Sequence, residues 1–137
     1  DLIKTIALDS IEGLENIDWL VLDDLSDAMV ILNHGERALS DTLLIQVRIG
    51  FQPPREKRRC LSDILAWMNE NRFIFYGVAE DQNGTARLTT SISEDKDLIE
   101  QTNADIIFVP SSTRRQKLDQ NQAGKLTFLL RTLYGVN

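Results

Sequence analysis

The alternation of two apolar periodicities along the chain constrains its fold more than any other sequence feature. Short apolar stretches typical of strands occur at 2–8, 18–23, 42–51, 72–79 and 104–110. Stretches with apolar residues three or four positions apart, which are typical of amphipathic helices, occur at 26–39, 61–71 and 120–135. Strands that alternate with helices predict an α/β fold in which helices flank a sheet. No repeat or linker interrupts the pattern, so we expect residues 1–137 to form a single domain.

Local patterns add expectations about individual elements. The strand at 18–23 is nearly continuous in apolar residues, so we expect both of its faces to be buried. Asn71 can take the left-handed conformation that ends a helix, and Gly135 suits the same position after the last helix. Asn83 and Gly84 predict a tight turn.

Composition excludes several classes of protein. The chain has 137 residues, of which 42% are hydrophobic and 26% charged, so it can bury a core and is not disordered. With 21 acidic and 15 basic residues it carries a net charge of −6, which disfavours a nucleic-acid partner. No apolar run reaches the roughly 20 residues of a membrane helix, so we expect no membrane partner. The single Cys60 excludes an internal disulfide framework and favours a reduced, cytoplasmic location.

The glycine spacing excludes the usual cofactor cradle. Mononucleotide and dinucleotide folds hold phosphate or ribose with closely spaced glycines after the first strand. The glycines here are Gly13, Gly35, Gly50, Gly77, Gly84, Gly124 and Gly135. No two of them are separated by one residue, so we expect no cofactor to bind to this chain. Because the chain opens on a strand-like stretch without Met, we expect a domain excised from a longer protein.

Four residues, three of them at predicted element ends and His34 in the middle of a predicted helix, are candidates for chemistry. Asp23 and Asp24 end a predicted buried strand, where a metal or catalytic carboxylate is common. The favoured interpretation is that one of them, or Ser26, caps the next helix. His34 is the only histidine, and a surface or packing role is favoured because no acidic or thiol partner lies at helical spacing. Cys60 precedes a helix, where a thiol pKa can be lowered, yet a buried small residue is the favoured interpretation.

A basic cluster stands out in this acidic chain. It precedes the helix predicted at 61–71 and comprises Arg55, Lys57, Arg58 and Arg59. Basic side chains just before a helix N-terminus can hold a phosphate or carboxylate. The alternative is a solvated charged loop, which we favour.

Most of the chain resembles a known family. "LDSIEGLENIDWLVLDDLSDAMVILNHGERALSDTLLIQVRIGF" and "LSDILAWMNENRFIFYGV" resemble the C-terminal half of FkbM-type methyltransferases. "ADIIFVP" and "AGKLTFLLRTLYGVN" resemble a C-terminal extension found in many members. The resemblance implies a Rossmann-like sheet with flanking helices that lacks the N-terminal cofactor-binding half. Family members transfer a methyl group from S-adenosylmethionine to hydroxyls, often those of sugars or polyketide-type molecules.

The residues that the family uses for chemistry are mostly replaced. The framework residues that match are Asp18, Leu20, Leu22, Asp23, Ile31 and Leu32. The family's lysine, its Glu or Gln, its glycine, its second glutamate and its later strand glutamate correspond to Val21, Leu25, Ser26, Ala28 and Arg48. A methyl-transfer base or metal site needs carboxylates. Asp23 is therefore the one remaining candidate catalytic residue, and the resemblance predicts a degenerate active site.

These observations lead to one main hypothesis and two alternatives. We expect a non-catalytic structural or interaction module of a larger bacterial protein of glycan or natural-product assembly. The first alternative is the C-terminal half of an active O-methyltransferase, with S-adenosylmethionine as cofactor of the full-length parent. The second is a phosphate- or sugar-binding module that uses the basic cluster at 55–59.

We also expect the sheet edge at 18–23 to be covered. A homodimer or a missing N-terminal half would cover it, or residues 1–8 would fold over it. Across neighbouring strand ends, Arg48 is a candidate ion-pair partner of Asp23.

Overall fold

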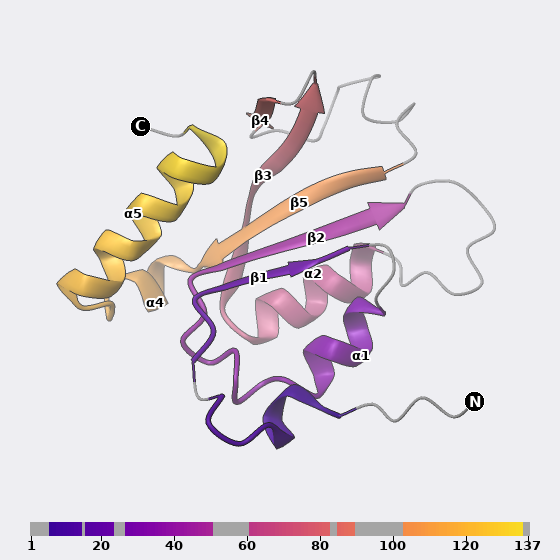
Figure 1. Ribbon diagram of the computed structural model, residues 1–137, viewed down its shortest axis with the longest axis vertical. Helices are drawn as coiled ribbons and strands as arrows, with labels where there is room; N and C mark the ends of the chain where they lie inside the picture. Colours follow the sequence, from indigo (N-terminus) through magenta and orange to yellow (C-terminus); the bar gives the residue numbers. More distant parts are fainter. Residues whose placement is uncertain are drawn as a thin grey trace.

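Five strands form one mixed sheet (Figure 1). The computed structural model describes residues 6–14, 16–23, 27–50, 61–82, 85–89 and 103–135. The strands are β1 (Trp19–Leu22), β2 (Leu44–Gly50), β3 (Phe73–Gln82), β4 (Thr85–Thr89) and β5 (Asn103–Pro110). Their order in the sheet is β1-β2-β5-β3-β4. β1 is parallel to β2, and β5 runs antiparallel to both of its neighbours, β2 and β3. Hence β1, β2 and β3 share one direction.

Helices connect and flank these strands, as the α/β prediction requires. They are η1 (Leu8–Ser10, a 3-10 turn), α1 (Ala28–Asn33), α2 (Leu61–Glu70), α4 (Ser112–Arg115) and α5 (Gln120–Tyr134). α5 has a capping box, because the Asp119 carboxylate accepts the Gln122 N–H and the Gln122 amide oxygen accepts the Asp119 N–H. It ends at Gly135, whose φ of 67° confirms the predicted left-handed stop. Within the described ranges, no helix is long and apolar enough to cross a membrane.

Two apolar layers cover the two faces of the sheet. Alternate side chains of β2 and β5 point to opposite faces, because successive residues of a strand alternate. On one face, Ile45, Val47 and Phe108 pack with Leu32 of α1 and residues of α2. On the other face, Leu44, Ile107 and Val109 pack with Leu126 and Tyr134 of α5. The molecule is therefore a sheet between an α1–α2 layer and an α5 layer.

The structure corrects residues 6–8 of the strand predicted at 2–8, while residues 2–5 lie outside the described residues, and it shortens the predicted helix at 26–39. Residues 6–7 are extended without sheet partners, and η1 begins at Leu8. α1 covers only 28–33, because the Asp27 carboxylate caps its start and the chain turns at His34. At Gly35 an added Cβ would lie 2.9 Å from Leu8 and 3.0 Å from the Ile31 carbonyl oxygen. Gly35 thus lies close to the 6–8 segment, and the helix ends before it.

β1 is not buried on both faces, which corrects a second expectation. Leu22 is 4% exposed, but the side chains of Trp19 and Val21 are 41% and 46% exposed. Sequence continuity of apolar residues indicated a central strand. In the sheet, β1 is an edge strand. Trp19 and Val21 are not part of the apolar cluster in which α5 packs against β2 and β5.

The end of α2 differs from the prediction by one residue. Arg72, not Asn71, has the left-handed conformation, with φ 62°. The Asn71 side-chain amide instead donates to the Trp67 carbonyl oxygen at 2.9 Å. The predicted turn at Asn83 and Gly84 lies outside the described residues, while Gln82 and Thr85 pair across β3 and β4 on either side of it.

Candidate functional site

Asp23 lies at the carboxyl end of β1, as predicted. Leu22 pairs with Val47, so Asp23 and Arg48 are the next residues of two neighbouring parallel strands. The carboxyl ends of parallel strands are where open α/β sheets bind ligands. The Asp23 side chain is exposed. The position is therefore suited to a catalytic acid, provided that neighbouring groups complete a site.

Arg48 has a partner that the sequence analysis did not consider. Its Nε lies 3.0 Å from Oδ1 of Asp105, and its Nη2 lies 3.3 Å from Oδ2. The two residues are opposite each other in the β2–β5 register. This bidentate geometry is the strong form of an arginine–carboxylate pair. Arg48 is thus oriented toward β5, while its predicted pairing with Asp23 stays a prediction.

The other candidates from the sequence do not gather around Asp23 in the described residues. His34 is exposed at the C-terminal end of α1, and its carbonyl oxygen accepts the N–H of Asp9 at 3.1 Å. Among the described residues, no three His, Cys, Asp or Glu side chains lie close enough to hold a metal ion. Asp24, Arg55, Lys57, Arg58, Arg59 and Cys60 lie outside the described ranges.

An apolar cavity of about 730 Å³ borders the edge of β1. Its walls come from three segments, namely the N-terminal segment (Ile6, Ala7, Leu8), β1 (Leu20, Val21, Leu22) and the α1 region (Asp27, Val30, Ile31, His34). Residues 6–8 therefore lie across a cavity from β1 and do not pair with it in the sheet. Only the tertiary structure reveals this cavity, because nothing in the sequence pattern indicates that the N-terminal segment lies opposite β1 and α1.

Asp9 joins two of these segments. Its carboxylate accepts the backbone N–H groups of Arg37 at 3.1 Å and Ala38 at 2.7 Å. The Arg37 guanidinium in turn donates to the Asp9 carbonyl oxygen. The Ala38 N–H, more than any other group, lowers the pKa of Asp9 below its usual value. Asp9 thus acts as a cap for the turn that follows α1, a role that its sequence pattern alone does not reveal.

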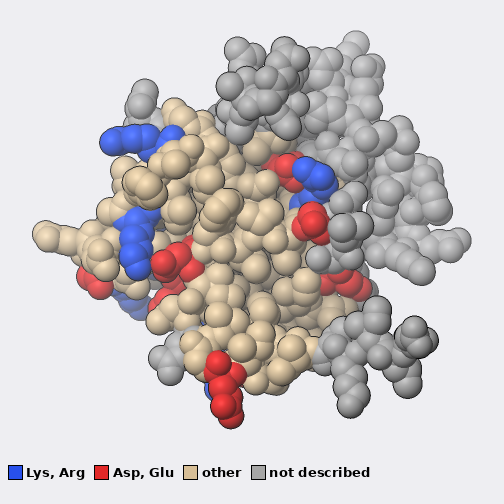
Figure 2. Space-filling view, viewed as in Figure 1, with Lys and Arg blue, Asp and Glu red and all other residues tan. Residues whose placement is uncertain are grey.

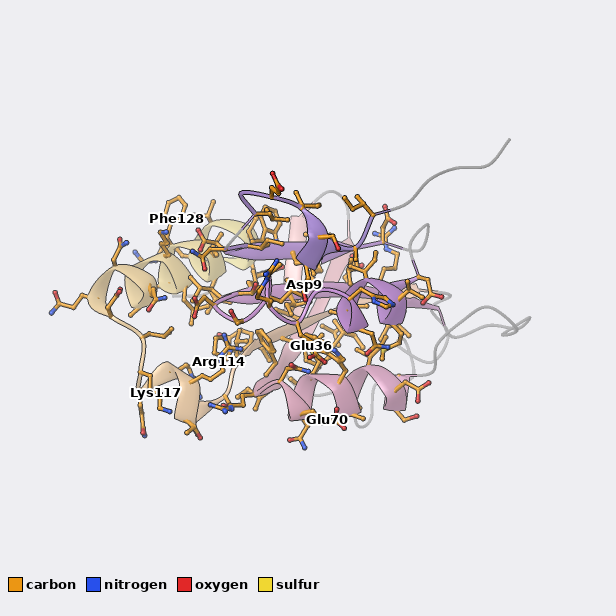
Figure 3. The ribbon with its side chains drawn as sticks, turned by 90° about the horizontal axis from the view of Figure 1, so that it is seen from below. Asp9, Glu36, Glu70, Arg114, Lys117 and Phe128 are labelled. Atoms are coloured by element: carbon orange, nitrogen blue, oxygen red, sulfur yellow. The ribbon has the colours of Figure 1, made fainter. Side chains whose placement is uncertain are left out.

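A polar hollow of about 410 Å³ lies at the other end of the sheet, near the starts of β2 and β3. It is lined by Glu36, Leu39, Ser40, Asp41, Glu70, Asn71, Arg72, Arg114, Lys117, Leu118 and Gln122. Figure 3 labels Glu36, Glu70, Arg114 and Lys117 of this group. On the face that Figure 2 shows, acidic and basic side chains are interspersed over a mostly uncharged surface.

Comparisons with known proteins do not identify a relative. No family model matches the chain, and neither a curated protein nor a solved structure does.

Proposed function

We propose that this chain is a degenerate methyltransferase-like domain that serves as a structural or interaction module and performs no chemistry by itself. It would be the C-terminal half of a Rossmann-like fold within a larger bacterial protein of glycan or natural-product assembly. The proposal starts from the sequence resemblance to FkbM-type methyltransferases. The observation that carries it is the incomplete edge of the sheet at β1.

The directions of the strands support the proposal that the chain is one half of a doubly wound fold. α1 connects β1 to the parallel β2, and α2 precedes β3, which runs in the same direction. Successive parallel strands joined through helices are the repeating unit of Rossmann-like folds. β5 departs from a purely parallel order, because it is inserted antiparallel between β2 and β3.

The β1 edge supports association with a further part of the fold. The resemblance implies that strands of the N-terminal half lie beside this strand in complete family members. Here the exposed Trp19 and Val21 lie on that edge strand, next to the apolar cavity. An added strand would satisfy the unpaired backbone groups of an edge and would shield apolar surface from water. The partner is a missing N-terminal half or a second copy of the chain.

The chemistry at the carboxyl end of β1 supports the loss of methyl transfer. Removal of a proton from a substrate hydroxyl needs a carboxylate or another base close to the reacting oxygen. The resemblance places a family glutamate at the position of Arg48, a cation that is held by Asp105. Asp23 is the one family carboxylate that the resemblance keeps at this end of the sheet, and His34, the other described candidate, lies at the far end of α1.

Isothermal titration calorimetry with S-adenosylmethionine tests this proposal. We expect no stoichiometric binding, because the sequence has no closely spaced glycines to receive the ribose and methionine groups. Stoichiometric binding in the micromolar range at the end of the sheet where Asp23 lies would contradict the proposal. It would favour the alternative that the chain is half of an active methyltransferase.

A further inference from the structure

The polar hollow lies at the end of the sheet opposite Asp23 and is independent of the proposed function. Ser40 and Asp41 precede β2, Asn71 and Arg72 precede β3, and Arg114 follows β5, which runs in the opposite direction. Its volume of about 410 Å³ falls within the range of about 300–1,000 Å³ that small-molecule sites occupy.

Arg114 is a fixed cation with donors to spare. Its guanidinium donates to the carbonyl oxygens of Ser40 at 2.7 Å, Thr42 at 3.3 Å and Asn71 at 3.2 Å. Its Cζ also lies 4.5 Å from the centroid of the Phe73 ring. A guanidinium carries five N–H donors, and these contacts use three, so about two remain. Burial lowers the pKa of Arg114, the nearby Asp41 carboxylate partly offsets this effect, and Arg72 adds to it. An anionic ligand group would act in the same direction as Asp41.

Arg72 occupies a backbone conformation that favours glycine. With φ at 62°, it is the one non-glycine residue of positive φ among those the structure describes. Residues held in this region often belong to functional sites, because a strained position is retained where its side chain is used. The Arg72 carbonyl oxygen accepts the Ser111 N–H at 2.8 Å, so the turn is tied to the start of α4.

Among the described residues, the charges that line the hollow are balanced. Arg72, Arg114 and Lys117 are cationic, whereas Glu36, Asp41 and Glu70 are acidic. Figure 3 shows that the labelled members come from different parts of the chain, with Glu36 after α1, Glu70 at the end of α2, and Arg114 and Lys117 in and after α4. A purely anionic ligand would meet three carboxylates, and a purely cationic ligand three cations. A ligand that carries both charges meets partners for each.

We propose that this hollow binds a small zwitterion of the α-amino-acid type. The ligand carboxylate contacts the remaining donors of Arg114 and the side chains of Arg72 and Lys117. The ligand ammonium group contacts Glu36 and Glu70. Leu118, which also lines the hollow and is partly exposed, contacts an apolar ligand side chain.

Three related probes test the charge requirement. L-leucine carries both charges, N-acetyl-L-leucine only the negative one, and L-leucinamide only the positive one. Calorimetry or NMR titration should show saturable binding of L-leucine, with each blocked form bound at least about tenfold more weakly, because one set of charged contacts is lost. No saturable binding of L-leucine, or equal affinity for the three compounds, would overturn the proposal.

The variant Arg72→Gly separates binding from folding. Glycine tolerates φ 62°, so this variant should fold at least as well as the wild type while it loses one cation of the hollow. We expect its affinity for L-leucine to fall by about tenfold. Arg115→Ala is the matched control, because Arg115 is an exposed arginine of α4 that does not line the hollow. An equal loss of affinity in both variants would refute the assignment.

The same variants keep this site distinct from the proposed function. S-adenosylmethionine itself carries an α-amino-acid group, so it could enter the hollow. Binding of S-adenosylmethionine that Arg72→Gly abolishes would place it in the hollow and support this inference. Binding that Arg72→Gly leaves unchanged would instead count against the non-catalytic proposal alone.

Discussion

At the scale of single residues, Asp9 holds together two segments that are distant in the sequence. Its carboxylate accepts two N–H groups of the turn after α1, and its own N–H donates to His34. The Asp9 N–H thus satisfies the His34 carbonyl oxygen at the end of α1, a position where helices leave carbonyl acceptors without partners, and the Asp9 carboxylate satisfies two N–H groups of the following turn. These bonds also place the 6–8 segment as a wall of the apolar cavity.

The variant Asp9→Asn should lower the melting temperature at neutral pH, because it removes a charged acceptor of two N–H groups. The folded pKa of Asp9 is lowered from an unfolded value of 3.8, so its contribution is present above that value. It is lost as the pH falls through the lowered folded pKa. Thermal unfolding at about pH 7 and about pH 3 should therefore show a difference from wild type that shrinks in acid.

Glu12→Gln is the control for Asp9, since Glu12 is an exposed acid of the same N-terminal segment. It should leave the melting temperature unchanged. If Asp9→Asn were as stable as the wild type at neutral pH, the capping role would be wrong.

The Arg48–Asp105 pair leads to a second prediction at this scale. The side chains are 43% and 17% exposed, so solvent screening keeps the contribution of the pair modest. Arg48→Gln should lower the free energy of unfolding by about 0.5–1 kcal/mol. Arg48→Glu should cost more, about 1–2 kcal/mol, because two acids would then lie opposite each other on neighbouring strands. Urea denaturation measures both changes, and neither variant should gain methyltransferase activity.

Double-mutant cycles identify the partner of Arg48. A cycle with Asp105→Asn should give a coupling energy of about 0.5–1 kcal/mol. A parallel cycle with Asp23→Asn tests the pairing that the sequence analysis considered. A coupling to Asp105 near zero would contradict the importance of the bidentate contact.

At the scale of elements, α5 forms from local signals. Asp119 and Gln122 cap its first turn, Gly135 ends it, and its apolar residues face β5 and β2. Because capping groups and helical periodicity act within a few residues, such an element can be predicted without its neighbours. α1 is the opposite case, since the chain turns at His34 and Gly35 lies close to Leu8, a residue distant in the sequence.

Removal of the α5 cap should have a defined cost. Asp119→Ala loses the side-chain acceptor of the Gln122 N–H and should lower the free energy of unfolding by about 1 kcal/mol. Urea denaturation followed by circular dichroism measures this change. Asn121→Ala, an exposed substitution in the same helical turn, should change stability much less. Equal effects of the two substitutions would show that the capping box contributes nothing specific.

At the scale of the whole molecule, the sheet has one edge that invites association. β1 exposes Trp19 and Val21, and the apolar cavity lies beside it. The α1–α2 layer and the α5 layer cover the central strands, so this edge differs from the rest of the sheet. Contiguous exposed apolar surface next to unpaired strand edges is typical of interaction sites.

Sedimentation at micromolar concentration should show self-association of the isolated chain, or its association with an added N-terminal half. Val21→Lys should abolish this association without unfolding the chain, because the Val21 side chain is 46% exposed and a lysine on an edge strand opposes strand addition. The control is Ile74→Lys, which places the same charge on β3 at a residue that is 40% exposed. If Val21→Lys and Ile74→Lys weakened association equally, the β1 edge would be excluded as the association surface. A chain that stays monomeric and does not bind an added N-terminal half would exclude it as well.

The sequence by itself determined the α/β class and most of the elements on which the sheet depends. β2, α2, β3, β5 and α5 lie close to their predicted ranges, because periodicity, capping residues and Gly135 act locally. For the candidate site, the sequence correctly placed Asp23 at the end of a strand but did not determine which residues surround Asp23.

The tertiary structure decided which strands are neighbours, and with that the rest of the site. β1 lies at an edge of the sheet, as the family resemblance led us to expect, but the continuity of its apolar residues wrongly predicted that both of its faces are buried. β5 is the last strand along the chain but lies between β2 and β3 in the sheet, and this position makes Asp105 the partner of Arg48. Arg114 likewise contacts Ser40, Thr42 and Asn71, which are far from it in the sequence. These contacts depend on the order of the strands in the sheet.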